Sequence, residues 1–209
     1  MSRTSQRALL IFTRNPEPGK CKTRLAASIG DRAALDIYRF LLRHTSAIAR
    51  KLEGVDRLVY FSEHLGGGTY WDPASFQYRL QSGEDLGERM LQAFREAFSK
   101  GYSEVVIIGS DLYDLSTEDL STAFRELAQN EVVLGPASDG GYYLIGLKRL
   151  IPSLFRGKQW GTETVLKDSL ADLKDFSTFL LPVRNDVDRY EDIEGNPVFE
   201  PFLNQKEND

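Results

Sequence analysis

A basic segment follows the first apolar run of the chain. The stretch FTRNPEPGKCKTRLA, residues 12–26, comes directly after the run ALLI and holds four basic residues with a single glutamate. We expect a strand to end here and a helix to follow, so that backbone N–H groups and the helix dipole favour an anion. Lys20, Lys22 and Arg24 would add side-chain charge. Gly19 would let the backbone approach a ligand, and two prolines would stiffen the loop, which predicts a site for a small anion.

Two other interpretations of this basic segment compete with anion binding. A P-loop, G-x-x-x-x-G-K-[ST], requires glycine where Pro16 and Cys21 stand, so that motif is rejected. The charges could also be ordinary solvated loop charges, which is usual for a basic cluster. The two prolines restrict the backbone and favour an ordered binding loop over an ordinary solvated loop.

Three aspartates are candidate metal ligands. Asp111 ends the apolar run EVVIIGSD, and a carboxylate at the end of a strand could hold Mg²⁺ against phosphate oxygens. Asp186 and Asp188 alternate within LPVRNDVDRYEDIEG, so both would point to one side if a strand continues there. Taken alone, such a pair is more often a solvated turn or a helix cap.

A glycine pair follows a fourth aspartate in GPASDGGYYLIGL. Asp139 could orient a substrate hydroxyl, while Gly140 and Gly141 permit a tight turn and a close approach of backbone to a ligand. Local chemistry alone favours a plain Asp-Gly hairpin turn into the strand that starts at Tyr142.

Strands and helices that alternate along the chain must position these residues. Apolar or β-branched runs predict strands over 8–13, 56–63, 104–111, 131–135, 142–147 and 176–183. Helical periodicity predicts helices over 31–53, 87–101, 116–129 and 162–173. Ser116 and Asp119 form a capping-box pattern, and Thr162 is expected to cap the last helix. The alternation predicts an α/β fold with a mostly parallel, Rossmann-like sheet covered by helices on both faces, which binds ligands at the carboxyl ends of its strands.

Composition narrows the class of protein. With 209 residues and 41% hydrophobic residues, we expect one domain over 1–209, with flexible tails at 1–6 and 203–209. No run is long enough to span a membrane and no secretory signal is evident, so a cytoplasmic protein is expected. A net charge of -5 argues against nucleic acid as a partner. One cysteine and two histidines make a disulfide framework or a His-based metal site improbable, while the oligomeric state stays open.

Five segments, in order, resemble the successive motifs of the DUF2064 group, also called radical-SAM/selenodomain-associated transferase 1. They are FTRNPEPGKCKTRLA, GEDLGERMLQAF, GSDLYDLS, LGPASDGGYYLIGL and WGTETVL, and the resemblance spans Leu9 to about Ile193. That group is similar to the CofC-like 2-phospholactate guanylyltransferases and, more distantly, to molybdenum-cofactor nucleotidyltransferases. The resemblance implies the GT-A nucleotide-diphospho-sugar transferase fold, a three-layer α/β/α sandwich that uses Mg²⁺ or Mn²⁺. The chain departs from the family at Leu112 and Tyr113, where Cys-Pro is usual, so the pocket wall beside the metal is expected to differ.

The same resemblance implies roles for individual residues. Those that match the nucleotide-binding loop are Arg14, Gly19, Lys20, Lys22, Thr23 and Arg24. Those expected near the base or ribose are Gly83, Asp85 and Gly87. Those expected to face the acceptor are Asp139, Gly140, Gly141, Gly161 and Thr162. The implied metal ligands are Asp111, Asp186 and Asp188, and Lys22, Arg24 and Asp111 are the expected catalytic residues.

The expected activity is nucleotidyl transfer from a nucleoside triphosphate to a small phosphorylated or acidic acceptor. An acceptor oxygen would attack the α-phosphorus and pyrophosphate would leave, with positioning and electrostatics supplying most of the catalysis. A GT-A glycosyltransferase that uses a nucleotide sugar is one alternative. A nucleotide-binding protein without turnover is the other, and retention of all three metal-type aspartates makes it less favoured.

Overall fold

A seven-stranded sheet runs through the part of the molecule that the computed structural model describes, residues 5–66 and 68–203. Its strands are β1 (Arg7–Thr13), β2 (Asp56–Phe61), β3 (Gln77–Leu80), β4 (Glu104–Ile108), β5 (Val132–Pro136), β6 (Tyr142–Leu147) and β7 (Thr178–Leu180). They lie in the order β3-β2-β1-β4-β6-β5-β7. Strand β6 runs antiparallel to both of its neighbours, and the other pairs are parallel. The mostly parallel sheet predicted from the alternation of elements is confirmed.

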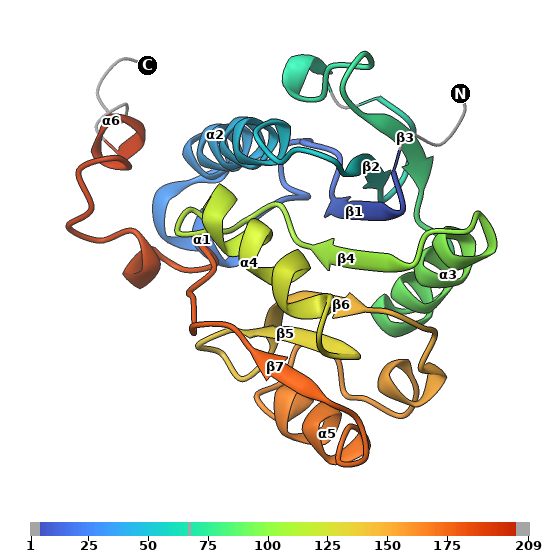
Figure 1. Ribbon diagram of the computed structural model, residues 1–209. Coiled ribbons are helices and arrows are strands. Elements are labelled where there is room, and N and C mark those ends of the chain that lie inside the picture. Colours follow the sequence, from blue (N-terminus) through green and yellow to red (C-terminus); the bar gives the residue numbers. More distant parts are fainter. Residues whose placement is uncertain (1–4, 67, 204–209) are drawn as a thin grey trace.

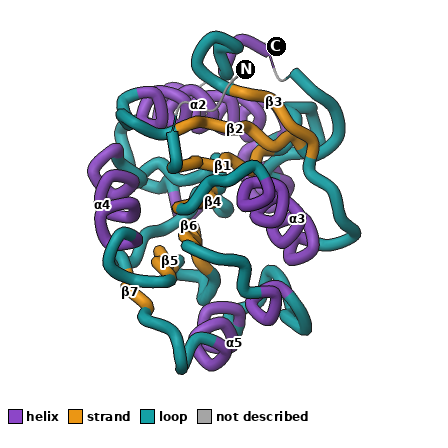
Figure 2. Tube along the Cα trace, turned by 45° about the vertical axis from the view of Figure 1, so that its right-hand side comes forward, coloured by secondary structure: helices purple, strands orange, loops and turns teal. Residues whose placement is uncertain are grey.

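Helices cover both faces of this sheet. They are α1 (Thr23–Ile29), α2 (Asp31–Arg50), α3 (Leu86–Ser99), α4 (Thr117–Leu127), α5 (Val165–Asp172) and α6 (Glu200–Leu203). Because side chains alternate along a strand, Leu9 and Ile11 of β1 pack with α2 and α4, whereas Ala8 and Leu10 pack with α3. Figure 2 shows α4 and α3 on opposite sides of the strands. The structure is the expected three-layer α/β/α sandwich.

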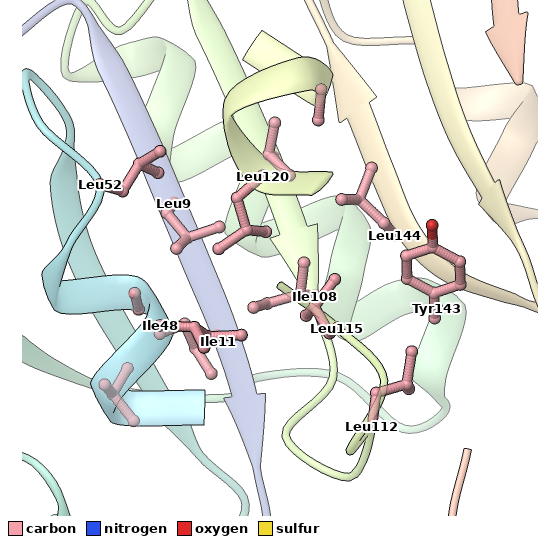
Figure 3. Packing of buried hydrophobic residues seen from close by; sticks show 14 of the residues in the cluster. Leu9, Ile11, Ile48, Leu52, Ile108, Leu112, Leu115, Leu120, Tyr143 and Leu144 are labelled. Atoms are coloured by element: carbon pink, nitrogen blue, oxygen red, sulfur yellow. The ribbon is translucent and has the colours of Figure 1, made fainter. Parts of the chain in front are cut away.

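One of the two apolar layers reaches the carboxyl ends of the strands. Figure 3 shows Leu9 and Ile108 at the centre of this layer, with Leu120 of α4 above them and Leu112 close to Tyr143 at its lower end. Leu112 is 3% exposed and follows Asp111 directly, so dense packing begins next to a candidate metal ligand. The rigid core therefore holds the backbone at Asp111 in place.

The last part of the described chain folds back over the first helices. Val187, Ile193 and Phe199 are buried against α1 and α2, and in Figure 1 this red segment runs past α1 to α6. Tyr113 joins the same cluster through ring contacts with Phe40 and Phe199. The segment that carries Asp186 and Asp188 is thus anchored by apolar contacts between the two aspartates and after them.

Several boundaries differ from the predictions. The sequence patterns did not indicate β3 or α1, and β7 is shorter than its apolar run. Helix α4 has the predicted capping box, in which Ser116 and Asp119 exchange side-chain bonds with each other's backbone N–H. The prediction that Thr162 caps α5 is wrong, because the helix begins at Val165 and the Thr162 hydroxyl donates to the Gln159 carbonyl instead.

Parts of the predicted tails fall within the structure. The predicted tails are residues 1–6 and 203–209. Most of them, residues 1–4 and 204–209, lie outside the described chain. The Gln6 carbonyl accepts a bond from the Ser103 N–H, and Leu203 closes α6. Within the described residues, no helix has both the length and the apolar character needed to cross a bilayer.

Candidate active site

A buried tyrosine joins the loop after β1 to the loop after β4. The Tyr38 hydroxyl, from α2, accepts a bond from the Arg14 N–H at 2.9 Å and lies 3.1 Å from the Thr13 hydroxyl and 3.3 Å from that of Ser110. Burial raises the pKa of Tyr38 to about 12, so the hydroxyl stays neutral and can both donate and accept. This network sets the spacing between Arg14 and Asp111.

The basic segment is an ordered loop that hydrogen bonds of Asn15 and Cys21 hold in place. The Asn15 side chain accepts from the Glu63 N–H at 3.1 Å and donates to the His64 carbonyl at 2.9 Å, which ties the loop to the segment after β2. The Cys21 thiol donates to the Asn15 carbonyl, and burial raises the pKa of this thiol. Cys21 is therefore a packing residue and not a reactive thiol. No local sequence pattern marks Asn15, since its partners Glu63 and His64 lie almost fifty residues away.

Lys22 adopts a backbone conformation that is rare for a residue with a side chain. Its φ of 52° and ψ of 44° lie in the left-handed region, at the N-cap of α1. The side chain is only 7% exposed, and its Nζ lies 2.9 Å from Oδ2 of Asp111. Burial opposes the charged form of Asp111, but Lys22 outweighs it, so the pKa of Asp111 is lowered. A left-handed conformation of this kind costs about 1–3 kcal/mol and is typical of functional positions.

Asp186 and Asp188 approach Asp111 from the far end of the chain. The Val187 N–H donates to the Asp111 carbonyl at 3.1 Å, which places the two aspartates on either side of that contact. Arg24 reaches Asp188, with 2.8 Å between its Nη1 and Oδ2. Asp192 holds the turn by accepting from the Asp188 N–H. The condition that a strand continues through Asp186 and Asp188 is not met, since β7 ends at Leu180 and an isolated bridge between Ala137 and Arg184 follows it.

Two cavities open at this edge of the sheet and meet at Asp111. The larger, of about 850 Å³, contains the basic loop, and the smaller, of about 260 Å³, is mostly apolar. Both are lined by Phe12, Leu86, Gly109 and Asp111. A ligand in each cavity would therefore meet the other beside the Asp111 carboxylate.

The residues singled out from the sequence divide between these cavities. The larger is lined by Arg14, Lys20, Lys22, Thr23, Arg24, Asp85, Asp111 and Asp188. The smaller is lined by Asp111, Asp139, Gly141, Gly161, Thr162 and Asp186. Gly19, Gly83, Gly87 and Gly140 line neither cavity. Two of these four have a clear packing reason, since a Cβ would lie 2.5 Å from Trp160 at Gly87 and 2.3 Å from the Glu163 carbonyl at Gly140.

Local roles accompany several of these positions. Asp85 is the N-cap of α3 and accepts from the Glu88 N–H at 2.8 Å. Asp139 accepts from the Gly141 N–H at 2.8 Å within the turn between β5 and β6, so the hairpin interpretation describes its backbone while its side chain still lines a cavity. Leu112 lines the smaller cavity, whereas Tyr113 packs elsewhere, so one of the two departures from the family alters the pocket wall.

The far wall of the larger cavity was not foreseen. It is formed by Gln81, Glu84 and Arg89, which lie after β3 and at the start of α3. Gln81 donates to the carbonyls of Thr13 and Tyr60, and Arg89 donates to the Gly83 carbonyl. Polar side chains at the start of an amphipathic helix look like ordinary surface residues in the sequence. Only the position of β3 brings them to the cavity.

The carboxylates around Asp111 fit a divalent cation in chemistry. Burial and the negative charge of Asp111 raise the pKa of Asp186 to about 6, and Asp139 adds to the effect. Hard oxygen donors crowded in this way are the ligands that Mg²⁺ and Mn²⁺ prefer. Among the described residues, the carboxylate oxygens of Asp111, Asp186 and Asp188 do not all lie within 4.8 Å of one another. Two of these carboxylates, Asp111 and Asp188, pair instead with Lys22 and Arg24.

Another group of potential ligands lies at the rim of the larger cavity. Ligand atoms of Glu17, Glu63 and His64 fall within 4.8 Å of one another. Lys20 already occupies this cluster, since its Nζ lies 2.7 Å from Glu17 and 3.2 Å from Glu63. The ammonium group supplies the positive charge there, and Lys20 is directed toward the rim and away from Asp111.

The fold is similar to those of a solved candidate nucleotide-diphospho-sugar transferase and a solved cytidylyltransferase. The chain belongs to the DUF2064 family, whose model, described as "Uncharacterized protein conserved in bacteria", matches residues 45–162. A solved candidate nucleotide-diphospho-sugar transferase from Desulfovibrio desulfuricans G20 is 30% identical, with a TM-score of 0.81 over 94% of this chain and 91% of that chain. The membership expected from five motifs is confirmed.

More distant solved structures share the fold alone. The CMP:2-keto-3-deoxy-manno-octonic acid synthetase complexed with CTP is 10% identical, with a TM-score of 0.56 over 90% of this chain and 95% of that chain. A Mycobacterium tuberculosis H37Rv protein in complex with manganese is 13% identical, with a TM-score of 0.51 over 95% of this chain and 99% of that chain. No curated protein sequence matches this chain significantly.

Proposed function

We propose that this protein is a metal-dependent nucleotidyltransferase that transfers a nucleotidyl group from a nucleoside triphosphate to a small-molecule acceptor. The triphosphate would occupy the larger cavity and the acceptor the smaller. The observation that carries the proposal is the meeting of a polar, basic cavity and an apolar cavity at one carboxylate, Asp111. Both cavities open on one sheet, which also supports a single domain over 1–209.

The ion pairs of the site support this proposal. Lys22 and Arg24 are each matched with an aspartate across the cleft, at 2.9 Å and 2.8 Å. Binding of a metal and a triphosphate would exchange partners, since the aspartates would turn to the metal and the basic side chains to phosphate oxygens. Charge stays balanced in both states, so a net-acidic protein can accept a polyanion at this position.

Residues of the chain have distinct parts in the proposed reaction. Lys22 and Arg24 donate hydrogen bonds to the phosphates and stabilise the charge that develops as pyrophosphate leaves. Arg14, whose backbone N–H is held by the Tyr38 hydroxyl, extends the same positive surface, and Thr23 lines the same cavity at the start of α1. Phe12 and Leu86 separate the cavities and limit the access of water to the reacting atoms.

The metal is part of the same proposal. Asp111, Asp186 and Asp188 would hold Mg²⁺ or Mn²⁺, which supplies Lewis-acid stabilisation of the phosphate oxygens. The manganese complex of a protein with the same fold is consistent with such a cofactor. Asp111 and Asp188 also pair with Lys22 and Arg24, so the positions of these two carboxylates do not depend on the metal alone.

Glycosyl transfer is the second candidate function. The solved structure of the 30% identical Desulfovibrio protein is that of a candidate nucleotide-diphospho-sugar transferase. This description favours a nucleotide-sugar donor. The same two cavities would then hold the nucleoside diphosphate and the sugar with its acceptor. The products separate the two reactions, because nucleotidyl transfer releases pyrophosphate and glycosyl transfer releases a nucleoside diphosphate.

A thermal-shift panel followed by product analysis tests the proposal. Nucleoside triphosphates and nucleotide sugars are added to the full chain with and without Mn²⁺, and the best donor is then incubated with mixed acceptors. We expect a triphosphate to raise the melting temperature only with Mn²⁺ and to yield pyrophosphate. Release of nucleoside diphosphate from a sugar donor would establish the second candidate. A metal-dependent shift without any turnover would instead indicate a nucleotide-binding protein.

A further inference from the structure

The smaller cavity is negative at its mouth and apolar in its depth. Its charged side chains are Asp111, Asp139 and Asp186, and no lysine, arginine or histidine of the described chain lines it. Its inner walls include Met90, Ile145 and Val165. A phosphate or carboxylate group placed in it would face carboxylates without a cationic side chain to pair with it.

A bound metal would not remove the excess of acidic over basic side chains in this cavity. A cation held by Asp111 and Asp186 would offset those two carboxylates, and the triphosphate would share its charge. Asp139 would remain as a further negative group that lines the cavity. Lys22 and Arg24 line the larger cavity and not this one, and they already form ion pairs with Asp111 and Asp188.

The apolar wall is fixed by close contacts of the backbone. At Gly87, a Cβ would lie 2.5 Å from the Trp160 indole, so the absence of a side chain lets the indole pack against the start of α3. Trp160 meets the Tyr142 ring edge-on, with 6.3 Å between ring centroids. On the opposite side, the Leu166 N–H donates to the Gly140 carbonyl at 2.9 Å. These contacts make a rigid aromatic surface suited to a ring or an aliphatic chain.

One polar group in this wall lacks a partner. The Tyr142 hydroxyl is buried and has no hydrogen-bond partner among the described residues. A buried hydroxyl in this state favours a ligand that can hydrogen-bond to it. A hydroxylated molecule meets that requirement and also tolerates the carboxylates at the mouth, to which it can donate.

Resting on the proposed nucleotidyl transfer, we propose that the acceptor is a hydroxylated molecule with an apolar body and without a phosphate or carboxylate of its own. This replaces the phosphorylated or acidic acceptor expected from the sequence. The acceptor hydroxyl forms a bond to the α-phosphorus, and the bond from that phosphorus to the bridging oxygen breaks. Pyrophosphate leaves with the electron pair, and the hydroxyl proton passes to solvent water.

Four probes separate the two features of the acceptor. They are 3-phenoxy-1,2-propanediol, its monophosphate ester, glycerol and glycerol 3-phosphate, which vary the apolar body and the anionic group independently. Binding to the full chain with a triphosphate and Mn²⁺ is measured by saturation-transfer NMR and titration. We expect 3-phenoxy-1,2-propanediol to bind at least tenfold more tightly than its phosphate ester and than glycerol. Tighter binding of either phosphate ester, or no measurable binding of any probe, overturns the proposal.

Two variants tie the result to this cavity. Trp160→Ala should abolish the preference for the phenoxy compound over glycerol, whereas Trp160→Phe should keep most of it. Asp139→Asn should reduce the discrimination against the phosphate ester at least threefold. If the triphosphate and Mn²⁺ raise the melting temperature of the wild-type chain but selectivity is reversed, only the acceptor class is wrong. If they produce no shift, the proposed nucleotidyl transfer itself fails.

Discussion

Lys22 and Asp111, 89 positions apart in the chain, form an ion pair at the junction of the two cavities, with 2.9 Å between Nζ and Oδ2. The lysine comes from the N-cap of α1 and the aspartate from the loop after β4. This contact joins the basic half of the cleft to the acidic half. Removal of either side chain would leave a buried or partly buried charge without its partner, so the pair is the most informative place to begin mutagenesis.

Replacement of Lys22 should impair the chemical step. Lys22→Ala is expected to raise the activation barrier by about 3 kcal/mol, roughly a hundredfold in kcat, because a preorganised charge at the phosphates is lost. Steady-state pyrophosphate release measures the effect. Lys20→Ala is the matched control, since Lys20 pairs with Glu17 and Glu63 at the rim and should change kcat by less than about tenfold. Equal losses in the two variants would contradict the assigned role of Lys22.

The left-handed backbone at Lys22 should be visible in stability. Lys22→Gly and Lys22→Ala both remove the ion pair, but glycine adopts φ of 52° without a steric penalty. We expect the glycine variant to have a free energy of unfolding about 1 kcal/mol higher than the alanine variant. Urea denaturation of the two proteins measures this difference. Equal midpoints and slopes would mean that the backbone strain is absent in solution.

Loss of the Tyr38 hydroxyl should weaken the hydrogen bonds that position the site, while every charged side chain of the site remains. Tyr38→Phe leaves the Arg14 N–H without its acceptor and is expected to lower the free energy of unfolding by about 1–3 kcal/mol. Because the spacing between Arg14 and Asp111 relaxes, kcat should fall as well. Tyr113→Phe is the control, since that ring contributes aromatic packing with Phe40. A fall in stability with unchanged kcat would limit Tyr38 to a structural role.

Asp119 should contribute a pH-dependent stability. Burial opposes its charged form, but hydrogen bonds from Arg184 and Ser116 prevail and lower its pKa. The unfolded chain, with an aspartate pKa of about 4, then binds the proton more readily than the folded chain. The stabilisation is therefore complete above about pH 4 and is lost as pH falls through the folded pKa. Urea unfolding of wild type and Asp119→Asn from pH 6 to pH 3 should show a shallower decline in the variant, and parallel declines would refute this assignment.

Gly87 should affect the acceptor more than the nucleotide. In Gly87→Ala the new Cβ would collide with Trp160, so the aromatic wall of the smaller cavity must shift. The apparent KM for the acceptor should rise at least fivefold, while the nucleotide-dependent thermal shift stays within error. Arg95→Ala, an exposed position on the same helix, controls for general effects on α3. An equal rise in the KM for the nucleotide would place Gly87 near the base or ribose after all.

The sequence indicated most of the fold because strand and helix periods are local properties. Hydrophobic runs marked β1, β4 and β6, and the Ser116–Asp119 pattern marked the start of α4 correctly. The short elements β3 and α1 were not predicted, because segments of four and seven residues carry too little periodicity. The Thr162 cap was misplaced since a threonine hydroxyl can bond equally well within a turn.

The candidate site was foreseen in part, for a similar reason. Lys22, Arg24 and Asp111 are recognisable by residue type at the expected ends of strands, and the structure brings them together. The contributions of Tyr38 and Asn15 depend on contacts between distant segments, and such contacts leave no local pattern. The division of the cleft into a polar and an apolar cavity likewise depends on how α3 and the loop at Trp160 pack.

Asp188 lies in the last part of the described chain, and this position determines when during synthesis the cleft can be completed. Arg24 and Asp188 are separated by 164 positions, so during translation the basic loop leaves the ribosome long before its acidic counterpart. Until Val187, Ile193 and Phe199 dock on α1 and α2, Arg24 lacks its partner Asp188, and Asp111 lacks the other two proposed metal ligands. Activity would therefore appear only in chains whose synthesis has passed this segment, and a stalled fragment would be inert.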